Sequence, residues 1–356
     1  MKLLVSGGMA AGGRLAACLL TLWCSIVPLP AAAQQPIAEA GPTLAAVRER
    51  GHLICATSDP LPGFAQIGAE GRWTGFDVDF CRAVAVAIFG DAGRMEFLPL
   101  PGDSRFAPLQ TGTVDLIARN GAWTMRRDTS YDAGFVGPSF FDGQAFMVPQ
   151  ALGMVSAYEL DEVSICVLAD NTEQVSLQEF FYETQGNYTE VLYEDREDLA
   201  VAYRSGLCDA VSAPASWLNA IRRSLPAPAT HRILPERISK GALGPVVRAG
   251  DDQWKKIVQW TLYALIDAEE AGVTSLNVES LVAAKTHRIR RLLGLEGSFG
   301  PAIGLAPTFI SDVIRAVGNY GEMFERNFGP ATGAAMVRGQ NALWSNGGLL
   351  YAPPLK

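Results

Sequence analysis

The stretch that most constrains this chain runs from residue 73 to residue 90 and reads WTGFDVDFCRAVAVAIFG. Gly75 allows a turn, Asp77 is a good helix N-cap, and Asp79 adds a carboxylate to the first turn, where the helix dipole favours negative charge. The apolar residues behind these acids recur at helical spacing and are Cys81, Val84, Ala85 and Ile88. Gly90 ends the pattern. The stretch therefore predicts a helix that buries one side.

The order glycine, aromatic, aspartate, aliphatic, aspartate, aromatic in residues 75–80 resembles the signature of extracellular solute-binding proteins of the polar amino-acid transport class, family 3. The wider sequence resembles the general L-amino-acid-binding branch from about Thr43 to the C-terminus. The resemblance implies an α/β, two-lobed periplasmic-binding-protein fold of type II, with hinge crossings between the lobes. It also implies that an amino acid is captured between the lobes and delivered to an ABC transporter permease in the inner membrane.

A repeated pattern supports two lobes. Helix, glycine, turn and strand occur once around residues 112–117 and again around residues 206–211. Two similar α/β lobes explain this repeat better than one long sheet does. The expected division, in chain order, is a signal peptide at 1–33, lobe 1 at 34–148 and 246–285, lobe 2 at 149–245, and a C-terminal helical extension packed on lobe 1 at 286–356.

The first 33 residues are typical of a cleavable secretory signal. Lys2 and Arg14 supply positive charge, residues 15–27 supply an apolar core, and residues 31–33 are small. Residues 15–18 resemble a lipoprotein cleavage box, but Arg14 directly before them and the apolar run after them argue against lipidation. No later stretch is apolar over the ~18 residues that a membrane helix needs. We therefore expect a periplasmic protein that does not span the membrane.

Charge and histidine spacing argue against several classes of partner. The chain has 29 basic and 37 acidic residues, a net charge of −8, and no basic cluster, so we expect no nucleic acid partner. His52, His231 and His287 are far apart and no C-x-x-C motif occurs, so we expect no metal and no cofactor. We expect the protein to be a monomer.

Four cysteines remain after the signal peptide, and they are Cys55, Cys81, Cys166 and Cys208. An even number in an oxidising compartment indicates disulfides, and four cysteines allow three pairings. We expect Cys55 to pair with Cys81 and Cys166 with Cys208, one bridge in each expected lobe. The alternative is that some of them are buried free thiols.

An amino acid needs an arginine and amide donors for its carboxylate and an acid for its ammonium. By the resemblance, Arg127 matches the carboxylate-binding arginine of a T-x-x-R motif, and Asn120 and the backbone amide of Ala122 precede it. Thr172 matches a threonine that donates to the carboxylate from the start of a lobe 2 helix. Arg105 matches an arginine that meets the side-chain carboxylate in binders of acidic amino acids. The alternative for Arg105 is an ion pair on a helix surface.

The roles of two further positions, Phe64 and Pro214, are less clearly implied by the resemblance. Phe64 follows a proline-rich loop and is expected either to form an aromatic wall against the ligand or to pack on its lobe. The acid that pairs with the ligand's ammonium in the family falls on Pro214, which cannot hold an ammonium group. We therefore expect Asp170 or Glu173 to take that role, or the solute to be another small carboxylate.

Two other functions compete with transport. A diverged paralogue with an altered or lost ligand would act as a sensor or scaffold. The same fold is reused by dehydratase-like enzymes, in which a pocket carboxylate donates a proton, and Glu173 is the only candidate for that role. No nucleophile, base and orienting group converge in the sequence, so we expect no catalytic residues and no enzyme activity.

Overall fold

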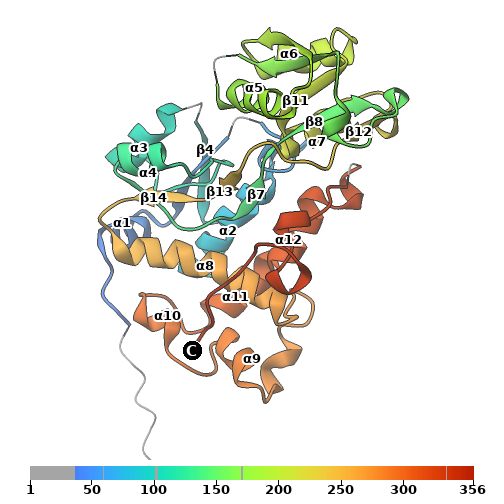
Figure 1. Ribbon diagram of the computed structural model, residues 1–356. Coiled ribbons are helices and arrows are strands. Elements are labelled where there is room, and N and C mark those ends of the chain that lie inside the picture. Colours follow the sequence, from blue (N-terminus) through green and yellow to red (C-terminus); the bar gives the residue numbers. More distant parts are fainter. Residues whose placement is uncertain (1–36, 59, 101–102, 170, 334) are drawn as a thin grey trace, which may run out of the picture. The chain divides into compact units, whose positions relative to one another are not determined.

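The computed structural model describes residues 37–356 except residues 59, 101–102, 170 and 334. The expected signal peptide and Asp170 thus lie outside the described residues. The described chain forms two five-stranded sheets, each covered by helices, and two short strands run between them (Figure 1). This is the two-lobed α/β arrangement that the sequence predicts.

The sheet of lobe 1 has the strand order β4-β1-β5-β14-β6. Its strands are β1 (Leu53–Thr57), β4 (Met95–Pro99), β5 (Leu116–Ile117), β6 (Ala133–Phe135) and β14 (Val246–Arg248). β1 runs parallel to β4 and β5, whereas β14 is antiparallel to its neighbours β5 and β6. The carboxyl ends of β1 and β5 therefore meet at one edge, which is where α/β sheets bind ligands.

The sheet of lobe 2 has the order β10-β9-β11-β8-β12. Its strands are β8 (Gln144–Pro149), β9 (Val163–Leu168), β10 (Tyr188–Tyr193), β11 (Ala210–Pro214) and β12 (His231–Ile233). β9 is parallel to β10 and β11, so three carboxyl ends again share an edge. We expected lobe 1 to extend to residue 148. Instead β8 pairs with β11, Met147 opposite Val211, so the chain enters lobe 2 before Gln144.

The two hinge crossings pair with each other. β7 (Phe140–Asp142) and β13 (Gly241–Leu243) form an antiparallel ribbon in which Phe141 lies opposite Ala242. A separate hairpin in lobe 1 joins β2 (Gln66–Ile67) to β3 (Trp73–Thr74).

The helices occupy both lobes and the C-terminal extension, and 3-10 turns link several of them. They are α1 (Pro42–Arg50), α2 (Phe76–Phe89), α3 (Phe106–Thr111), α4 (Met125–Ser130), α5 (Thr172–Thr184), α6 (Arg196–Arg204), α7 (Ala215–Ser224), α8 (Asp252–Glu270), α9 (His287–Leu292), α10 (Phe299–Ala302), α11 (Phe309–Val317) and α12 (Tyr320–Phe328). Among the described residues, no helix combines the length and apolar character that a membrane crossing requires.

Helix α2 forms where the sequence predicts it, but two details of that prediction are wrong. The N-cap is Gly75 rather than Asp77, which lies inside the first turn. Gly75 adopts φ 138°, and no larger residue fits there because a Cβ would collide with the Phe64 carbonyl. The helix is also buried on both sides rather than one. Strands of lobe 1 pack against α2, and the helices α8, α11 and α12 also pack against α2.

Within the C-terminal extension, residues 309–328 form two separate helices, α11 and α12, which pack on helices α2 and α8 of lobe 1. Gly318 adopts φ 88°, and Asn319 starts α12 with a capping box to Glu322. Beyond α12, Leu343 and Leu350 are buried, whereas Trp344 and Tyr351 are 52% and 61% exposed. Leu343 and Leu350 therefore pack more deeply than these two aromatic residues.

Both predicted disulfides are present. Cys55 of β1 bonds Cys81 of α2, and Cys166 of β9 bonds Cys208, with Cα–Cα distances of 6.3 and 5.7 Å. Each bond fastens a sheet to a neighbouring segment of its own lobe. The alternative of buried free thiols is therefore wrong for these four residues.

Replacing Cys166 and Cys208 together by alanine should destabilise the protein. The bond spans 42 residues, and releasing a loop of this length lowers the free energy of unfolding by about 2–4 kcal/mol. Urea unfolding followed by circular dichroism would measure the loss. Equal unfolding free energies for the variant and the oxidised parent would contradict the expectation.

Candidate ligand-binding site

A cavity of about 680 Å³ lies at the carboxyl ends of strands from both sheets. Its lobe 1 wall includes Ser58, Leu61, Arg105, Arg119, Asn120 and Arg127. Its lobe 2 wall includes Leu168, Asn171, Arg196, Pro214, Ser216 and Trp217. Most of these residues directly follow β1, β5, β9 or β11, so the topology of the two sheets brings them together.

A second hollow of about 800 Å³ adjoins this cavity, because Arg127 and Asn171 line both. It is walled by α4 and its preceding loop on one side and by the start of α5 on the other. Ala122 and Thr172 are among its lining residues. The two hollows together form the candidate binding site.

The wall of the cavity carries positive charge. Among the described residues that line it, four are arginines and none is acidic. Asp59 and Asp170, which are neighbours of lining residues in the chain, lie outside the described residues. A wall of guanidinium groups favours a ligand with carboxylate groups, which arginine binds in a bidentate manner.

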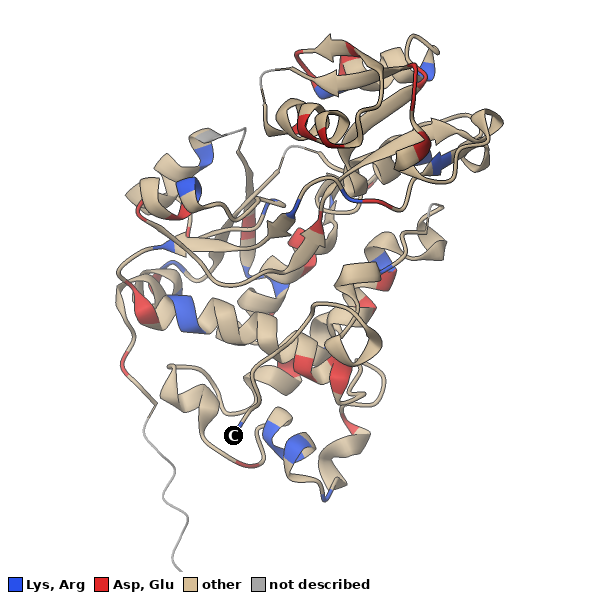
Figure 2. Ribbon diagram, viewed as in Figure 1, with Lys and Arg blue, Asp and Glu red and all other residues tan. Residues whose placement is uncertain are grey.

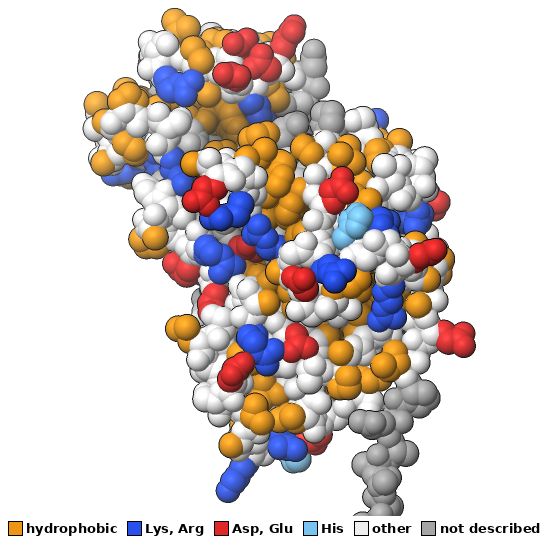
Figure 3. Space-filling model, turned by 180° about the vertical axis from the view of Figure 1, so that it is seen from behind, with side chains coloured by type: hydrophobic (Ala, Val, Ile, Leu, Met, Phe, Trp, Pro, Cys, Tyr) orange, Lys and Arg blue, Asp and Glu red, His pale blue; other side chains and the backbone are white. Residues whose placement is uncertain are grey.

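The outer surface has a different charge pattern. Acidic and basic positions occur in both lobes and in the extension (Figure 2). On the face in Figure 3, blue and red side chains lie among hydrophobic ones, and several blue side chains gather beside red ones left of the centre.

Arg127 is oriented by the T-x-x-R motif that contains it. Thr124 is the N-cap of α4, and its Oγ1 accepts a hydrogen bond from the Arg127 backbone N–H at 3.3 Å. The Arg127 side chain turns back toward the loop before the helix, where its Nη1 donates to the Ala122 carbonyl at 3.1 Å. The guanidinium is thereby held at the boundary that the two hollows share.

Ala122 presents its backbone to the same region. It forms an isolated antiparallel bridge with Leu243 of β13, in which the ladder hydrogen bonds come from the residues on either side. The N–H and C=O of Ala122 therefore point away from β13. The C=O meets Arg127, and among the described residues none accepts a hydrogen bond from the Ala122 N–H.

Asn120 links the site to helix α2. It adopts φ 42°, and its backbone N–H donates to Asp77 Oδ2 at 2.7 Å. Asp77 is only 4% exposed. Burial raises the pKa of Asp77 to about 7, while the Asn120 N–H and the charge of Arg119 act in the opposite direction. The signature carboxylate thus fixes the strained loop that carries the lobe 1 wall.

Three residues form the polar corner of lobe 2. Arg196 Nη2 donates to Glu173 Oε1 at 2.5 Å, and the Arg196 guanidinium lies 4.9 Å from the centre of the Trp217 ring. Burial raises the pKa of the Glu173 carboxyl, and Arg196 counteracts this shift. Glu173 lines neither hollow, whereas Arg196 and Trp217 line the cavity.

The side chain of Asn171 caps the start of α5. Asn171 Oδ1 accepts from the N–H groups of Glu173 and Gln174, at 2.8 and 3.1 Å. Thr172 is the first helical residue, is exposed, and lines the second hollow with Arg127. Thr172 and Arg127 thus belong to different lobes but line the same space.

Several residues named from the sequence come together at this site. Arg105, Asn120 and Arg127 line the cavity, and Ala122 and Thr172 line the adjoining hollow. Arg105 is 3% exposed, with its guanidinium 4.7 Å from the Phe106 ring centre. It therefore belongs to the cavity wall rather than to an exposed helix surface.

Phe64 is not in the wall of either hollow. It is 1% exposed, and its ring packs edge-on against Phe140 and Phe328 at centroid distances of 5.0 and 5.1 Å. The geometry favours packing on the lobe, because the neighbouring rings fill the space around it. Pro214, at the expected position of the ammonium-binding acid, does line the cavity.

The lining residues that the sequence analysis did not name as candidate site residues include Arg119, Arg196 and Trp217. Arg119 follows the strand ending at Ile117 closely, and Arg196 follows the strand ending at Tyr193. Applying the rule of strand carboxyl ends to every expected strand would have found these two. Trp217 gives no such signal, because its spacing is that of an ordinary core residue.

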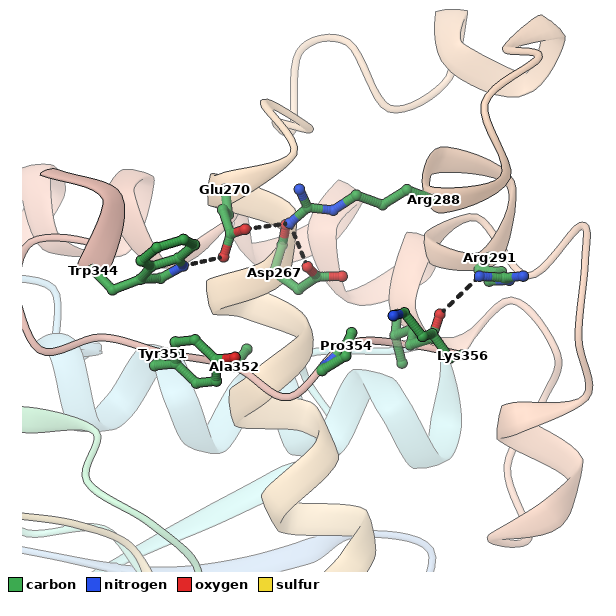
Figure 4. Close-up of a pocket in the computed structure, with 10 residues that line it drawn as sticks. Asp267, Glu270, Arg288, Arg291, Trp344, Tyr351, Ala352, Pro354 and Lys356 are labelled. Atoms are coloured by element: carbon green, nitrogen blue, oxygen red, sulfur yellow. Dashed lines mark hydrogen bonds and ion pairs between the residues drawn. The ribbon is translucent and has the colours of Figure 1, made fainter.

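Another hollow, of about 260 Å³, lies where the C-terminal tail meets α8 and α9 (Figure 4). Its two carboxylates, Asp267 and Glu270, both bind Arg288, at 2.5 and 3.1 Å. Trp344 Nε1 donates to Glu270 at 3.2 Å. The Arg288 contacts join α9 to α8, and the Trp344 hydrogen bond attaches the tail to α8, so we assign this hollow to packing. Within the described residues, no three His, Cys, Asp or Glu side chains are grouped so as to hold a metal ion.

Two α/β lobes, joined by two strands and enclosing a polar cavity at their strand ends, define a solute-binding protein. The chain belongs to the bacterial extracellular solute-binding proteins, family 3, whose family model matches residues 53–272.

Similar proteins cover most of the chain. It is 46% identical over 315 residues to the glutamate/glutamine/aspartate/asparagine-binding protein BztA of Rhodobacter capsulatus, covering 88% of this chain and 93% of that protein. It is 43% identical to the general L-amino acid-binding periplasmic protein AapJ of Rhizobium johnstonii, over 88% and 93% of the two chains. A periplasmic binding protein from Brucella ovis, solved with glutathione bound, is 43% identical with a TM-score of 0.81, over 88% and 99% of the chains.

The buried Asp77 should make stability depend on pH. Its folded-state pKa of about 7 exceeds the ordinary value of 3.8, so the folded protein holds an extra proton between these values. The free energy of unfolding should therefore fall as pH rises through this range, by at most about 1.4 kcal/mol per pH unit from this group. Asp77→Asn keeps an oxygen that accepts from Asn120 but has no group that titrates. Its free energy of unfolding should therefore not show this fall, so the variant should gain stability relative to the parent between about pH 5 and about pH 8. Urea unfolding at several pH values would show this, and parallel pH profiles would contradict it.

Proposed function

We propose that this protein captures amino-acid-type solutes in the periplasm and delivers them to the permease of an ABC transporter. The observation that carries the proposal is the position of Arg127, which is fixed by Thr124 and Ala122 at the boundary of the two hollows. A carboxylate bound there would meet a guanidinium and the Ala122 N–H together. Paired donors of this kind recognise the carboxylate common to all amino acids.

The names of the similar proteins agree with this chemistry. BztA is named for binding glutamate, glutamine, aspartate and asparagine, and AapJ for binding L-amino acids in general. The Brucella ovis protein was solved with glutathione, a tripeptide with an amino-acid group at one end. We infer that the solute of the present chain also carries an α-amino-acid group.

The partner of the solute's ammonium group is a separate part of the proposal. Pro214 stands at the position where the family has an acid. Glu173 is paired with Arg196 and lines neither hollow. We therefore favour Asp170 on its place in the sequence, immediately before Asn171.

We infer binding rather than catalysis. The dehydratase-like alternative needs Glu173 as a proton donor to the ligand, but its carboxylate is directed to Arg196. An exported protein that acts as a single chain would meet its permease in the periplasm. Both location and monomeric state belong to this proposal.

A thermal-shift screen with the standard amino acids, small dicarboxylates and glutathione would test the proposed function. A ligand at 100 times its Kd stabilises the folded state by about 2.7 kcal/mol, so a binder should raise the Tm clearly. Arg127→Ala should abolish the shift, because removing one partner of a buried charged pair weakens binding about 30-fold or more.

The matched control is Arg72→Ala. Arg72 pairs with Glu70 on the exposed β2–β3 turn and lines neither hollow. This variant loses the same charge and should keep the shift of the parent. A parent protein that responds to no member of the panel would refute amino-acid binding and favour a paralogue with a lost ligand.

A further inference from the structure

Among the described lining residues, Arg196 is the arginine that lobe 2 contributes to the cavity wall, whereas the other three come from lobe 1, which carries Arg127. It is the first residue of α6 and directly follows the loop at the carboxyl end of β10. Its side chain is 39% exposed and lines the cavity. Arg127 can bind the α-carboxylate of an amino acid, as proposed above, without help from the Arg196 guanidinium.

Only part of the guanidinium is used by the protein. Arg196 donates through Nη2 to Glu173 Oε1, and among the described residues no other atom accepts a hydrogen bond from this side chain. A guanidinium has five N–H donors. Its remaining donors are therefore available to a molecule in the cavity.

The orientation of the guanidinium is fixed before any solute arrives. The Trp217 ring stacks against it at 4.9 Å, and the half-buried Glu173 holds one of its edges. Gln144 in turn donates to the Glu173 backbone carbonyl at 2.8 Å, which ties this corner to β8. A donor held in this way loses little conformational entropy on binding, which favours its use as a ligand contact.

Glu173 takes one edge of the Arg196 guanidinium, and a solute with only one acidic group would leave the other N–H groups without an acceptor. With the solute's carboxylate on Arg127, lobe 2 would place the Arg196 cation against an uncharged part of the solute. Covering N–H donors without a new acceptor costs the hydrogen bonds that they make to water, even though Glu173 balances the charge. A second carboxylate on the solute removes this cost and adds a charge-assisted contact.

We propose that Arg196, supported by Trp217 and Glu173, is a second carboxylate subsite, and that the preferred solutes are amino acids with an acidic side chain. This inference rests on the proposed function, because it takes the α-carboxylate to be bound by Arg127. Glu173 is then a positioning residue: it holds Arg196 and competes with the solute for its donors.

Glutamate and glutamine separate this subsite from the rest of the site, because they have nearly the same shape and differ in side-chain charge. Isothermal titration of the full mature protein should show tighter binding of glutamate than of glutamine. Arg196→Gln should weaken glutamate binding by about 10- to 100-fold, the usual loss for a desolvated charged contact, and change glutamine binding by less than about 3-fold.

Two further variants control for the charge of Glu173. Glu173→Gln should leave glutamate binding unchanged or tighten it by up to about 5-fold, because Arg196 loses a competing partner. The double variant Arg196→Gln, Glu173→Gln should lose glutamate binding as Arg196→Gln does. Arg204→Gln, in the last turn of α6 and outside the cavity, removes the same charge from the same helix and should bind like the parent.

The outcomes distinguish this inference from the function on which it rests. Equal loss of glutamate and glutamine binding in Arg196→Gln, in a variant with the parent's circular dichroism spectrum, would refute the subsite and leave amino-acid binding intact. Equal weakening of both ligands by Glu173→Gln would also refute it, since Glu173 would then bind the solute's ammonium. A parent protein that binds no amino acid would refute the proposed function itself.

Discussion

The structure depends on one buried contact, the hydrogen bond from the Asn120 N–H to the carboxylate of Asp77. It joins the first turn of the central helix of lobe 1 to the loop that follows β5. That loop has an unfavourable backbone conformation at Asn120, and a strained residue persists only where its surroundings hold it. Burying Asp77 is itself costly, as its raised pKa indicates. The protein thus accepts a stability cost in order to fix the wall of its binding site.

Helix α2 can bear this cost because it is packed on both sides. The C-terminal extension covers the face that would otherwise meet water, and it also satisfies the second signature carboxylate. Asp79 accepts hydrogen bonds from Arg326 at 2.8 Å and from Asn327 at 2.8 Å, both on α12. The tail continues to the hinge, where Asn341 exchanges two hydrogen bonds with the backbone of Phe141 on β7. The extension therefore supports both the signature helix and one of the crossings between the lobes.

The two lobes contribute different parts of the site. In the proposed function, lobe 1 supplies Arg127 and the Ala122 amide, which would bind the carboxylate that every amino acid shares. Lobe 2 supplies Arg196 and Trp217, which under the proposed second carboxylate subsite would distinguish among side chains. Specificity is the difference between a protein's affinities for two ligands. Only groups that contact the variable part of the ligand can create such a difference, and the side chain is the variable part of an amino acid.

The sequence by itself indicated the elements that have local causes: the helix after Gly75 and the repeated order of helix, glycine, turn and strand that predicts two lobes. The expected disulfides came from the number of cysteines and their division between the lobes, and Arg127 came from the resemblance of its T-x-x-R motif. Periodicity, glycine caps and loop spacing depend on neighbours in the chain, so they can be read without the fold. Only the tertiary structure decided that Asp77 bonds Asn120, that Phe64 lies in the core, that Glu173 is occupied by Arg196, and that Arg196 faces the cavity. Each of these depends on contacts between segments distant in the chain, and local pattern carries no information about which segments meet.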